Sequence, residues 1–199
     1  MPPRPTRKDQ ITVHSTAIIC ADTDLRGEVT IGAGTVIHPK ASIYGLGGGV
    51  VIGEDCIVEE GVVIVNRGPE IMRIGRENHF MVQCHIQAQE IGDFNIFQPR
   101  SRVSSGVIIT NRCVLGIYPK PSQTLGQLYL FSPSSMFYLV GSSTITLESL
   151  PSPYTIVYGP ESLIRKWDGT AQITEDNLRM KHLEYLRDIL PKYNRLRVV

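Results

Sequence analysis

The sequence VHSTAIICADTDLRGEVTIGAGTVIHPKASI, which runs from Val13 to Ile43, carries an aliphatic residue at every sixth position. After two short interruptions the same spacing continues to Leu115. A short fixed period is typical of a solenoid, because each repeat buries its apolar residue only by stacking on its neighbours. Three six-residue units make a triangular coil of about 18 residues. We therefore predict a mainly β fold, a single-stranded left-handed parallel β-helix of hexapeptide repeats, with a C-terminal α-helix packed on its flank.

Residues one coil apart should stack into three inward-facing columns. The predicted columns are Val13, Ile31, Ile52, Ile74, Ile91 and Ile109; Ile19, Ile37, Val58, Phe80, Phe97 and Leu115; and Leu25, Ile43, Ile64, Ile86 and Val103. Four positions after an anchor the residue is usually small or slim, which suits a tight corner. Glycine follows four anchors of the first column, and the lack of a Cβ eases a sharp turn there. These glycines are Gly32, Gly53, Gly75 and Gly92.

The two interruptions of the period predict loops at corners of the solenoid. In the first, nine residues separate two anchors and the extra residues fall in the glycine-rich segment 45–49. In the second the separation is ten, with a turn-rich excursion at 66–70. Loops of solenoids often form the binding face. We expect these two corners and the exposed end coil to contact partners.

Composition limits the function. The chain has 199 residues and a net charge of +1, which does not favour nucleic acid or an anionic membrane as a partner. Residues 1–10 form a basic arm that no apolar segment follows, so a signal peptide is not expected. No apolar run reaches the roughly 20 residues of a membrane span. We expect Cys20, Cys56, Cys84 and Cys113 to be buried free thiols in a reducing cytosol.

The predicted β-helix occupies 11–159, and the C-terminal segment 160–199 is expected to be helical. Residues 161–167 are expected to form a short helix. A longer helix should begin at Thr174 as N-cap and end at Leu190, before Pro191. Its apolar stripe comprises Leu178, His182, Leu183, Tyr185, Leu186, Ile189 and Leu190. We expect the stripe to pack on the solenoid; contact with a partner helix is the alternative.

One enzyme class with this fold is the γ-class carbonic anhydrases, which the chain resembles in phrases such as EGVVI at 60–64. That family binds zinc through three histidines between subunits. The matching positions here are Val65, Val82 and Gln87, and none of them is a ligand that a zinc hydrase uses. We therefore expect no metal, no cofactor and no carbonic anhydrase activity.

The five histidines do not form an obvious alternative site. His79 and His85 are six apart, which puts them on successive faces of the triangle, and His182 lies on the C-terminal helix. Hexapeptide acyltransferases use a histidine as general base. His14 and His38 are the candidates, but neither has a neighbouring carboxylate in the sequence to orient it. The alternative function is therefore a hexapeptide-repeat enzyme, an acyltransferase or a γ-carbonic-anhydrase-like protein acting as a homotrimer.

Several motifs together resemble the dynactin subunit 6 family. They are RGEVTIG at 26–32, TVIHPKA at 35–41, VIGE at 51–54, IGDFN at 91–95, TIVYG at 155–159 and RDILPKY at 187–193. The resemblance implies a non-catalytic scaffold subunit of dynactin, at the pointed end of the actin-related filament, that supports dynein-driven transport on microtubules. It also implies contacts with dynactin subunit 5 and the pointed-end actin-related protein, an indirect link to cargo adaptors, and a location in the cytoplasm on the cytoskeleton.

The segment 118–143 departs from that family. It interrupts the period and carries five aromatic residues and one charged residue, Lys120. Three interpretations stay open. The first is a corner loop that packs on the helical flank, the second is a loop that contacts a partner, and the third is a retained intron translated in frame.

Overall fold

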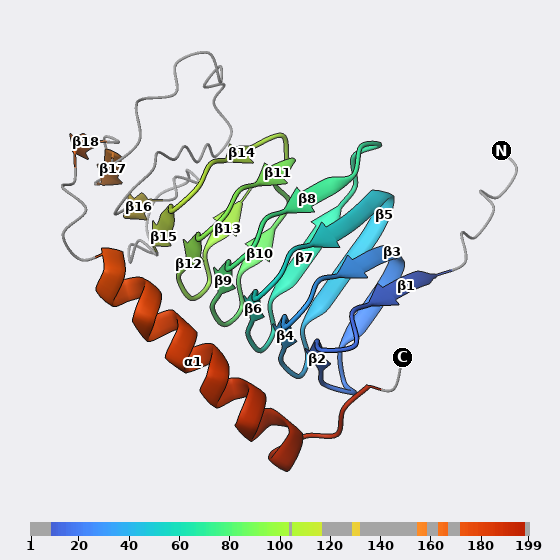
Figure 1. The fold of residues 1–199 in the computed structure, drawn as a ribbon. Coiled ribbons are helices and arrows are strands. Elements are labelled where there is room, and N and C mark those ends of the chain that lie inside the picture. The colour runs from blue at the N-terminus through green and yellow to red at the C-terminus, as the bar shows by residue number, and fades with distance from the viewer. Residues whose placement is uncertain are drawn as a thin grey trace, which may run out of the picture.

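The computed structural model describes residues 9–103, 105–116, 129–131, 155–158, 163–166 and 172–197. They form a triangular solenoid of short parallel strands with one long helix along its side (Figure 1). The solenoid strands are β1 Gln10–Val13, β2 Ile18–Ile19, β3 Asp24–Ile31, β4 Val36–Ile37, β5 Ser42–Ile52, β6 Ile57–Val58, β7 Val63–Asn66, β8 Met72–Ile74, β9 His79–Phe80, β10 His85–Ile86, β11 Glu90–Ile91, β12 Ile96–Phe97, β13 Arg102–Val103, β14 Ile108–Ile109 and β15 Val114–Gly116. The remaining elements are β16 Tyr129–Phe131, β17 Thr155–Tyr158, β18 Leu163–Lys166 and α1 Gln172–Tyr193.

The register of the strands confirms all three predicted columns. Val13 pairs with Ile31, and the first column then continues through successive coils to Ile109. The other two columns run from Ile19 to Leu115 and from Leu25 to Val103. Phe80 and Phe97 are fully buried and stack with their ring centroids 4.4 Å apart. The fold is therefore a left-handed parallel β-helix, as predicted.

The two predicted corner loops stack on each other. The long strands β3 and β5 pass around the same corner, and the register between them shifts between Gly27 and Val29, where β5 accommodates extra residues. Gly45 then pairs with Asn66 at the base of the next loop. The amide of Gly48 donates to the carbonyl oxygen of Gly68, 2.6 Å away. The excursion at 66–70 is thus continuous with the glycine-rich corner below it.

The four glycines that each follow an anchor of the first column are required for a different reason from the predicted one. None of them has a positive φ, so they do not supply an unusual turn conformation. Instead, a Cβ on Gly53 would lie 2.6 Å from the backbone of Gly75 in the next coil, and a Cβ on Gly32 would lie 2.5 Å from Gly53. Successive coils approach too closely at this point to accommodate a side chain.

A buried polar column lines the neighbouring corner. The predicted slim residues Thr35 and Cys56 are followed there, in the next two coils, by Asn78 and Asn95, which the pattern did not single out. The side-chain oxygen of Asn78 accepts from the amide of Asn95 at 2.9 Å, and the side-chain oxygen of Asn95 accepts from the amide of Cys113 at 2.6 Å. Each asparagine therefore satisfies backbone donors inside the solenoid.

All four cysteines are buried and free, as predicted. Burial raises the pKa of the Cys20 thiol to about 11 and that of Cys56 to about 12. Burial also raises the pKa of Cys84. Thiols of this kind stay protonated at neutral pH, so their role is to fill space in the core.

The C-terminal segment differs from the prediction. Residues 163–166 form strand β18, antiparallel to β17, so the short helix expected at 161–167 is wrong. The long helix begins at Gln172 rather than Thr174, and Pro191 lies inside its last turn. Most of the segment 118–143 lies outside the described residues; within it, β16 pairs antiparallel with β15. Among the described residues, no helix combines the length and apolarity needed to cross a membrane.

Candidate functional site

The helix α1 crosses the outer face of the sheet formed by β2, β4, β6, β9, β12 and β15. It begins near the last coil and ends at the first, where Leu196 forms a bridge with Cys20 (Figure 1). Its buried leucines pack on the outward residues of the first three strands of this face. These residues are Leu183, Leu186 and Leu190 on the helix and Ile18, Val36 and Ile57 on the sheet. The expected packing of the helix on the flank is confirmed.

One side of α1 is fixed by charged side chains at a corner of the solenoid. Positions one coil apart at this corner adopt a left-handed backbone, namely Gly34, Asp55, Glu77, Phe94 and Arg112. Arg187 donates to the carbonyl oxygen of Gly34 at 2.6 Å and also pairs with Asp55. Arg112 pairs with Asp176 at 2.9 Å near the start of the helix. The helix register on the solenoid is therefore set by charges.

The central contact of this row is a buried ion pair. The side chain of Arg179 is 7% exposed and pairs with Glu77 at 2.5 Å. The same guanidinium also contacts Asp176 and lies 5.1 Å from the ring centroid of Phe94. A buried guanidinium with two carboxylates and an aromatic face is well satisfied. The role of Arg179 was not predicted from the sequence. The available signal was the row of charged corner residues Asp55, Glu77 and Arg112, whose charges are opposite to those of their partners on α1.

The other side of α1 covers a cluster of imidazoles. His79 is 6% exposed, and its Nε2 lies 2.6 Å from Oε1 of Glu59. The ring of His182 lies 5.4 Å from that of His79. The Nε2 atom of His38 is buried with no hydrogen-bond partner among the described residues. These side chains come from successive coils and from the helix, so the topology assembles what the sequence spacing did not show.

The electrostatics of this cluster favour neutral imidazoles. Burial lowers the pKa of His38, although Glu59 opposes the shift. Burial, and then the proximity of His79, lowers the pKa of His182. Burial raises the pKa of Glu59, but its hydrogen bond with His79 and the other favourable contacts outweigh this effect and the net pKa is lowered. His79 and Glu59 therefore form one hydrogen-bonded pair beside two neutral rings.

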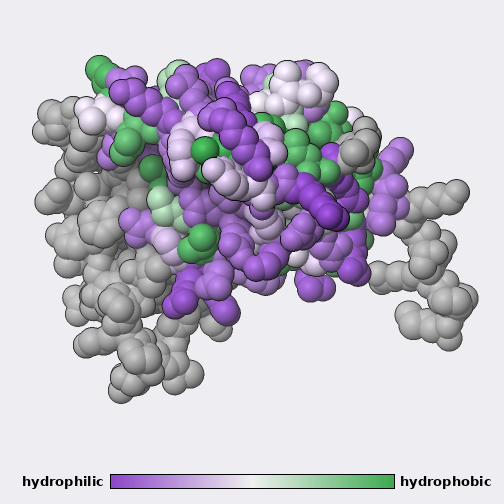
Figure 2. All heavy atoms as spheres, turned by 90° about the horizontal axis from the view of Figure 1, so that it is seen from below, coloured by the Kyte–Doolittle hydropathy of each residue, from purple (hydrophilic) through white to green (hydrophobic). Residues whose placement is uncertain are grey.

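An apolar groove of about 700 Å³ runs between α1 and the sheet next to this cluster. Leu178 and Tyr185 line it and are 69% and 59% exposed. The prediction placed both residues on the packing stripe. That part of the prediction is wrong, because the solenoid covers only the side of the helix that carries Leu183, Leu186 and Leu190. Figure 2, which views the molecule from below, shows that face as mostly hydrophilic, with smaller hydrophobic patches.

The three positions that match carbonic anhydrase ligands do not converge. Val65 is 4% exposed and stacks beside Gln87 of the next coil, on one face of the prism. Val82 lies at another corner, where its amide donates to Glu59 at 3.0 Å. The Gln87 amide contacts Nε2 of His85 at 2.7 Å. In the part of the chain that the structure describes, no group of three or more His, Cys, Asp or Glu side chains is arranged to hold a metal ion.

The histidines considered as general bases lie in different places. His14 is exposed in the first coil, where its ring contacts the Thr16 hydroxyl at 2.9 Å. His38 lies under α1. His79 and His85 lie on successive faces, as predicted from their spacing. The described residues thus form a β-helical prism with a helix docked along it and corner loops that project from it.

These features define a hexapeptide-repeat β-helix protein with a helix docked on its flank. A solved structure of a candidate acetyltransferase from Bacillus cereus shares this fold, with a TM-score of 0.50 and 14% identity over 90% of this chain and 91% of that one. The likeness extends to the fold alone. No family model matches the chain.

Relatives of similar length identify the family. The chain is 32% identical to dynactin subunit 6 of Danio rerio over 204 residues, covering 96% of this chain and 90% of the relative. It is 31% identical to dynactin subunit 6 of Xenopus tropicalis over 192 residues, covering 91% and 81%. The chain belongs to the dynactin subunit 6 family.

Proposed function

We propose that this protein is a non-catalytic scaffold subunit of dynactin, in the cytoplasm on the cytoskeleton. The observation that carries the proposal is the similarity to dynactin subunit 6 over nearly the whole chain. The similarity includes the helical segment as well as the hexapeptide coils, and the coils alone are common to many proteins. The chain would act at the pointed end of the actin-related filament, beside dynactin subunit 5 and the pointed-end actin-related protein. There it would support dynein-driven transport and the engagement of cargo adaptors.

The geometry supports a structural role. Every coil is held by three apolar columns, and the helix is fixed to the prism along most of its length by leucines and ion pairs. A body of this kind keeps its ends and corners at fixed separations, which is what a spacer between other subunits requires. His38 is buried and His79 is paired with Glu59, while His79 and His182 line the groove beside α1. The thiols of Cys20, Cys56 and Cys84 are buried and protonated.

Sedimentation of the endogenous protein tests the proposal. A gentle lysate is fractionated on a gradient, and co-migrating proteins are identified by mass spectrometry. We expect the chain in a very large particle together with actin-related and dynactin polypeptides. A small homotrimer without those polypeptides would contradict the proposal and favour a hexapeptide enzyme, because such enzymes build their sites between identical subunits.

A further inference from the structure

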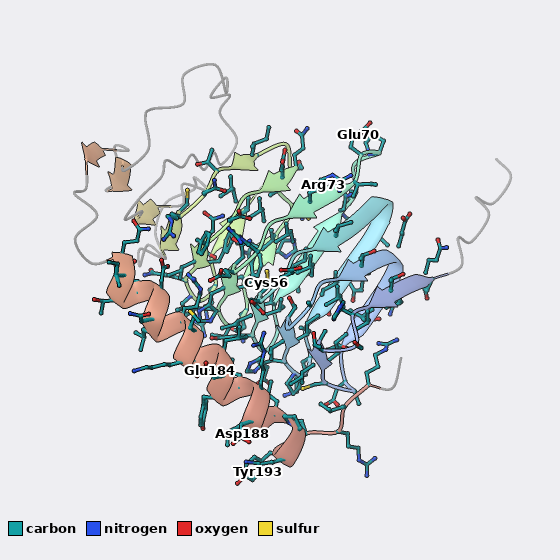
Figure 3. All side chains as sticks on the ribbon, viewed as in Figure 1. Cys56, Glu70, Arg73, Glu184, Asp188 and Tyr193 are labelled. Atoms are coloured by element: carbon teal, nitrogen blue, oxygen red, sulfur yellow. The ribbon has the colours of Figure 1, made fainter. Side chains whose placement is uncertain are left out.

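The corner of the prism that carries the segments 45–49 and 66–70 changes size abruptly along the axis. The anchors that flank this corner are nine residues apart between Ile43 and Ile52, and ten apart in the next coil. In the coil after that, Ile86 and Ile91 are only five residues apart. The excursion at 66–70 therefore projects beyond the coils that follow it. Glu70 lies at its tip in Figure 3, above Arg73 on β8. This step creates a recess that sequence analysis did not anticipate.

The projecting loop is built as a fixed structure. Asn66 is 6% exposed, and its side-chain amide donates to the carbonyl oxygens of Gly49 at 2.9 Å and Glu70 at 2.7 Å. Its side-chain oxygen accepts from the amide of Gly68 at 3.0 Å. One buried side chain thus joins the two ends of the loop to each other and to the coil below. The recess beneath the loop is preorganised, which reduces the entropic cost of binding.

The recess is a cleft of about 350 Å³ that spans three successive coils, at 65–70, 87–89 and 105–106. Ala88, which is 2% exposed, lies at its base. Coils are separated by about 4.8 Å, so the cleft is about 10 Å long, which matches about three residues of extended chain. Its accessible lining is mostly apolar, with the side chains of Arg67, Gln87 and Gln89 among those that line it, and its length matches a short peptide segment.

The cleft lining carries Arg67 and Glu70, and Arg102, which pairs in register with His85, adds a further positive charge beside it. The pKa of His85 is lowered mainly by burial and then by the nearby positive charges of Arg102 and Arg67. No carboxylate acts on that ring within the described structure. Among the described residues no ion pair involves Arg67 or Arg102, whereas Arg26 is paired with Asp24. Glu70 at the loop tip is the one carboxylate that lines the cleft.

We propose that this cleft binds an acidic, extended segment of a neighbouring subunit, with Arg67 and Arg102 pairing with its carboxylates. The inference rests on the proposed function, because it takes the partner from the same assembly. Guanidinium groups form bidentate pairs with carboxylates, and Gln87 and Gln89 supply neutral amides for the backbone of the bound segment. Electrostatic complementarity of this kind contributes mainly to specificity and to the rate of association.

Two variants of equal charge test the site. Arg67→Glu with Arg102→Glu reverses the charge at the cleft. Arg100→Glu with Arg195→Glu makes the same change in net charge at exposed positions outside it that take part in no ion pair among the described residues. Tagged chains are expressed in cells that lack the endogenous protein, and the amount retained in the large particle is measured at low and physiological salt. We expect the cleft variant to be retained roughly tenfold less than the wild type at low salt, with the difference shrinking at physiological salt as the charges are screened, and the control variant to match the wild type.

A photo-crosslinking residue in place of Gln89 identifies the occupant. We expect the crosslinked peptide to come from another subunit of the particle and to be rich in Asp and Glu. Normal retention of the cleft variant, or a crosslink to a basic or apolar peptide or to nucleic acid, would overturn the inference while leaving the scaffold role intact. Absence of the wild-type chain from the particle is a different result, because it overturns the scaffold role and the proposed partner with it.

Discussion

The inside of the solenoid and the contact between the solenoid and α1 are held by different chemistry. Inside, the three columns are apolar, and the largest side chains, such as Phe80 and Phe97, are fully buried. Under the helix, three leucines are flanked on one side by ion pairs and on the other by imidazoles. Apolar burial does not depend on pH or salt, whereas charged and imidazole contacts do. The prism should therefore be the stable body, and the helix should be the part that responds to conditions.

The largest expected effect comes from placing a charge inside the prism. Ile64 and Ile86 are neighbours in one column and are fully buried. We expect Ile64→Asp or Ile86→Asp to lower the free energy of unfolding by more than about 4 kcal/mol, because an unpaired carboxylate is buried and the packing is lost. Circular dichroism during thermal unfolding measures the change.

The matched control is Val82→Asp, since Val82 is 38% exposed. This variant should stay within about 0.5 kcal/mol of the wild type. A soluble Ile64→Asp protein with a native spectrum and an unchanged midpoint would contradict the assignment of that column.

A smaller effect is expected at the centre of the helix contact. Arg179→Met keeps an unbranched apolar stem but removes the guanidinium and leaves Glu77 without its cation. We expect a loss of about 2–3 kcal/mol, because an ion pair with little exposure is broken from one side. Hydrogen exchange of the α1 amides should accelerate more than exchange of the coil amides, which separates helix release from global unfolding.

The control for this prediction is Lys192→Met, which removes an exposed pair with Asp188 on the same helix. Its effect should be within about 0.5 kcal/mol. Equal acceleration of exchange in the helix and the coils of Arg179→Met would show that α1 is not a separate unit of stability.

The close approach of successive coils gives a third prediction, again within the prism. In Gly53→Ala the new Cβ would lie 2.6 Å from the backbone of Gly75, which has no freedom to retreat. We expect a loss of about 1–3 kcal/mol from overpacking. Gly49→Ala is the control, because its Cβ would meet only the side chain of Glu28, at 3.2 Å. If the two variants melt at the same temperature, the coils are less tightly stacked than the structure indicates.

The two regions also differ in how far the sequence predicts them. Within the prism one inward residue every six positions determines both the column and the register, so Val13 to Leu115 could be assigned from spacing alone. The glycine column was located correctly, but the contact it avoids lies in the next coil and is not visible in local sequence. Asn78 and Asn95 were missed because an asparagine side chain is unusual at a slim corner. Its presence is explained only by the backbone N–H groups of the next coil, which donate to it.

The helix contact was less predictable because its partners are far apart in the sequence. Arg179 and Glu77 are separated by 102 residues, and Arg187 and Asp55 by 132. An apolar stripe indicates which helix face is hydrophobic but not how wide the receiving surface is, which is why Leu178 and Tyr185 were assigned to the wrong environment. The recess beside 66–70 was missed for a similar reason, since it depends on the short corner in the following coil.

The smallest expected effect is a pH dependence confined to the helix contact. His38 and His182 face Glu59 and His79 on the solenoid side, and Lys181 and Glu175 line the same groove. The pKa of His38 and that of His182 are lower in the folded chain than the usual value near 6.5, mainly because of burial. The unfolded chain therefore binds these protons more readily, and the stability they contribute is present above about pH 6.5 and is lost as the pH falls towards the folded pKa values.

We expect exchange of the α1 amides to accelerate between pH 7.5 and pH 5.5, after correction for intrinsic rates, while the coil amides change less. His38→Asn with His182→Asn should flatten this dependence, and His14→Asn, in the exposed first coil, should leave it unchanged. NMR titration of the imidazole protons provides a second measurement that does not depend on the variants folding normally. His85 shifts in the same direction from another face, so the helix-specific readout is essential. A helix that is equally protected at both pH values would mean that the imidazole cluster tolerates protonation and that the ion pairs and leucines alone hold α1.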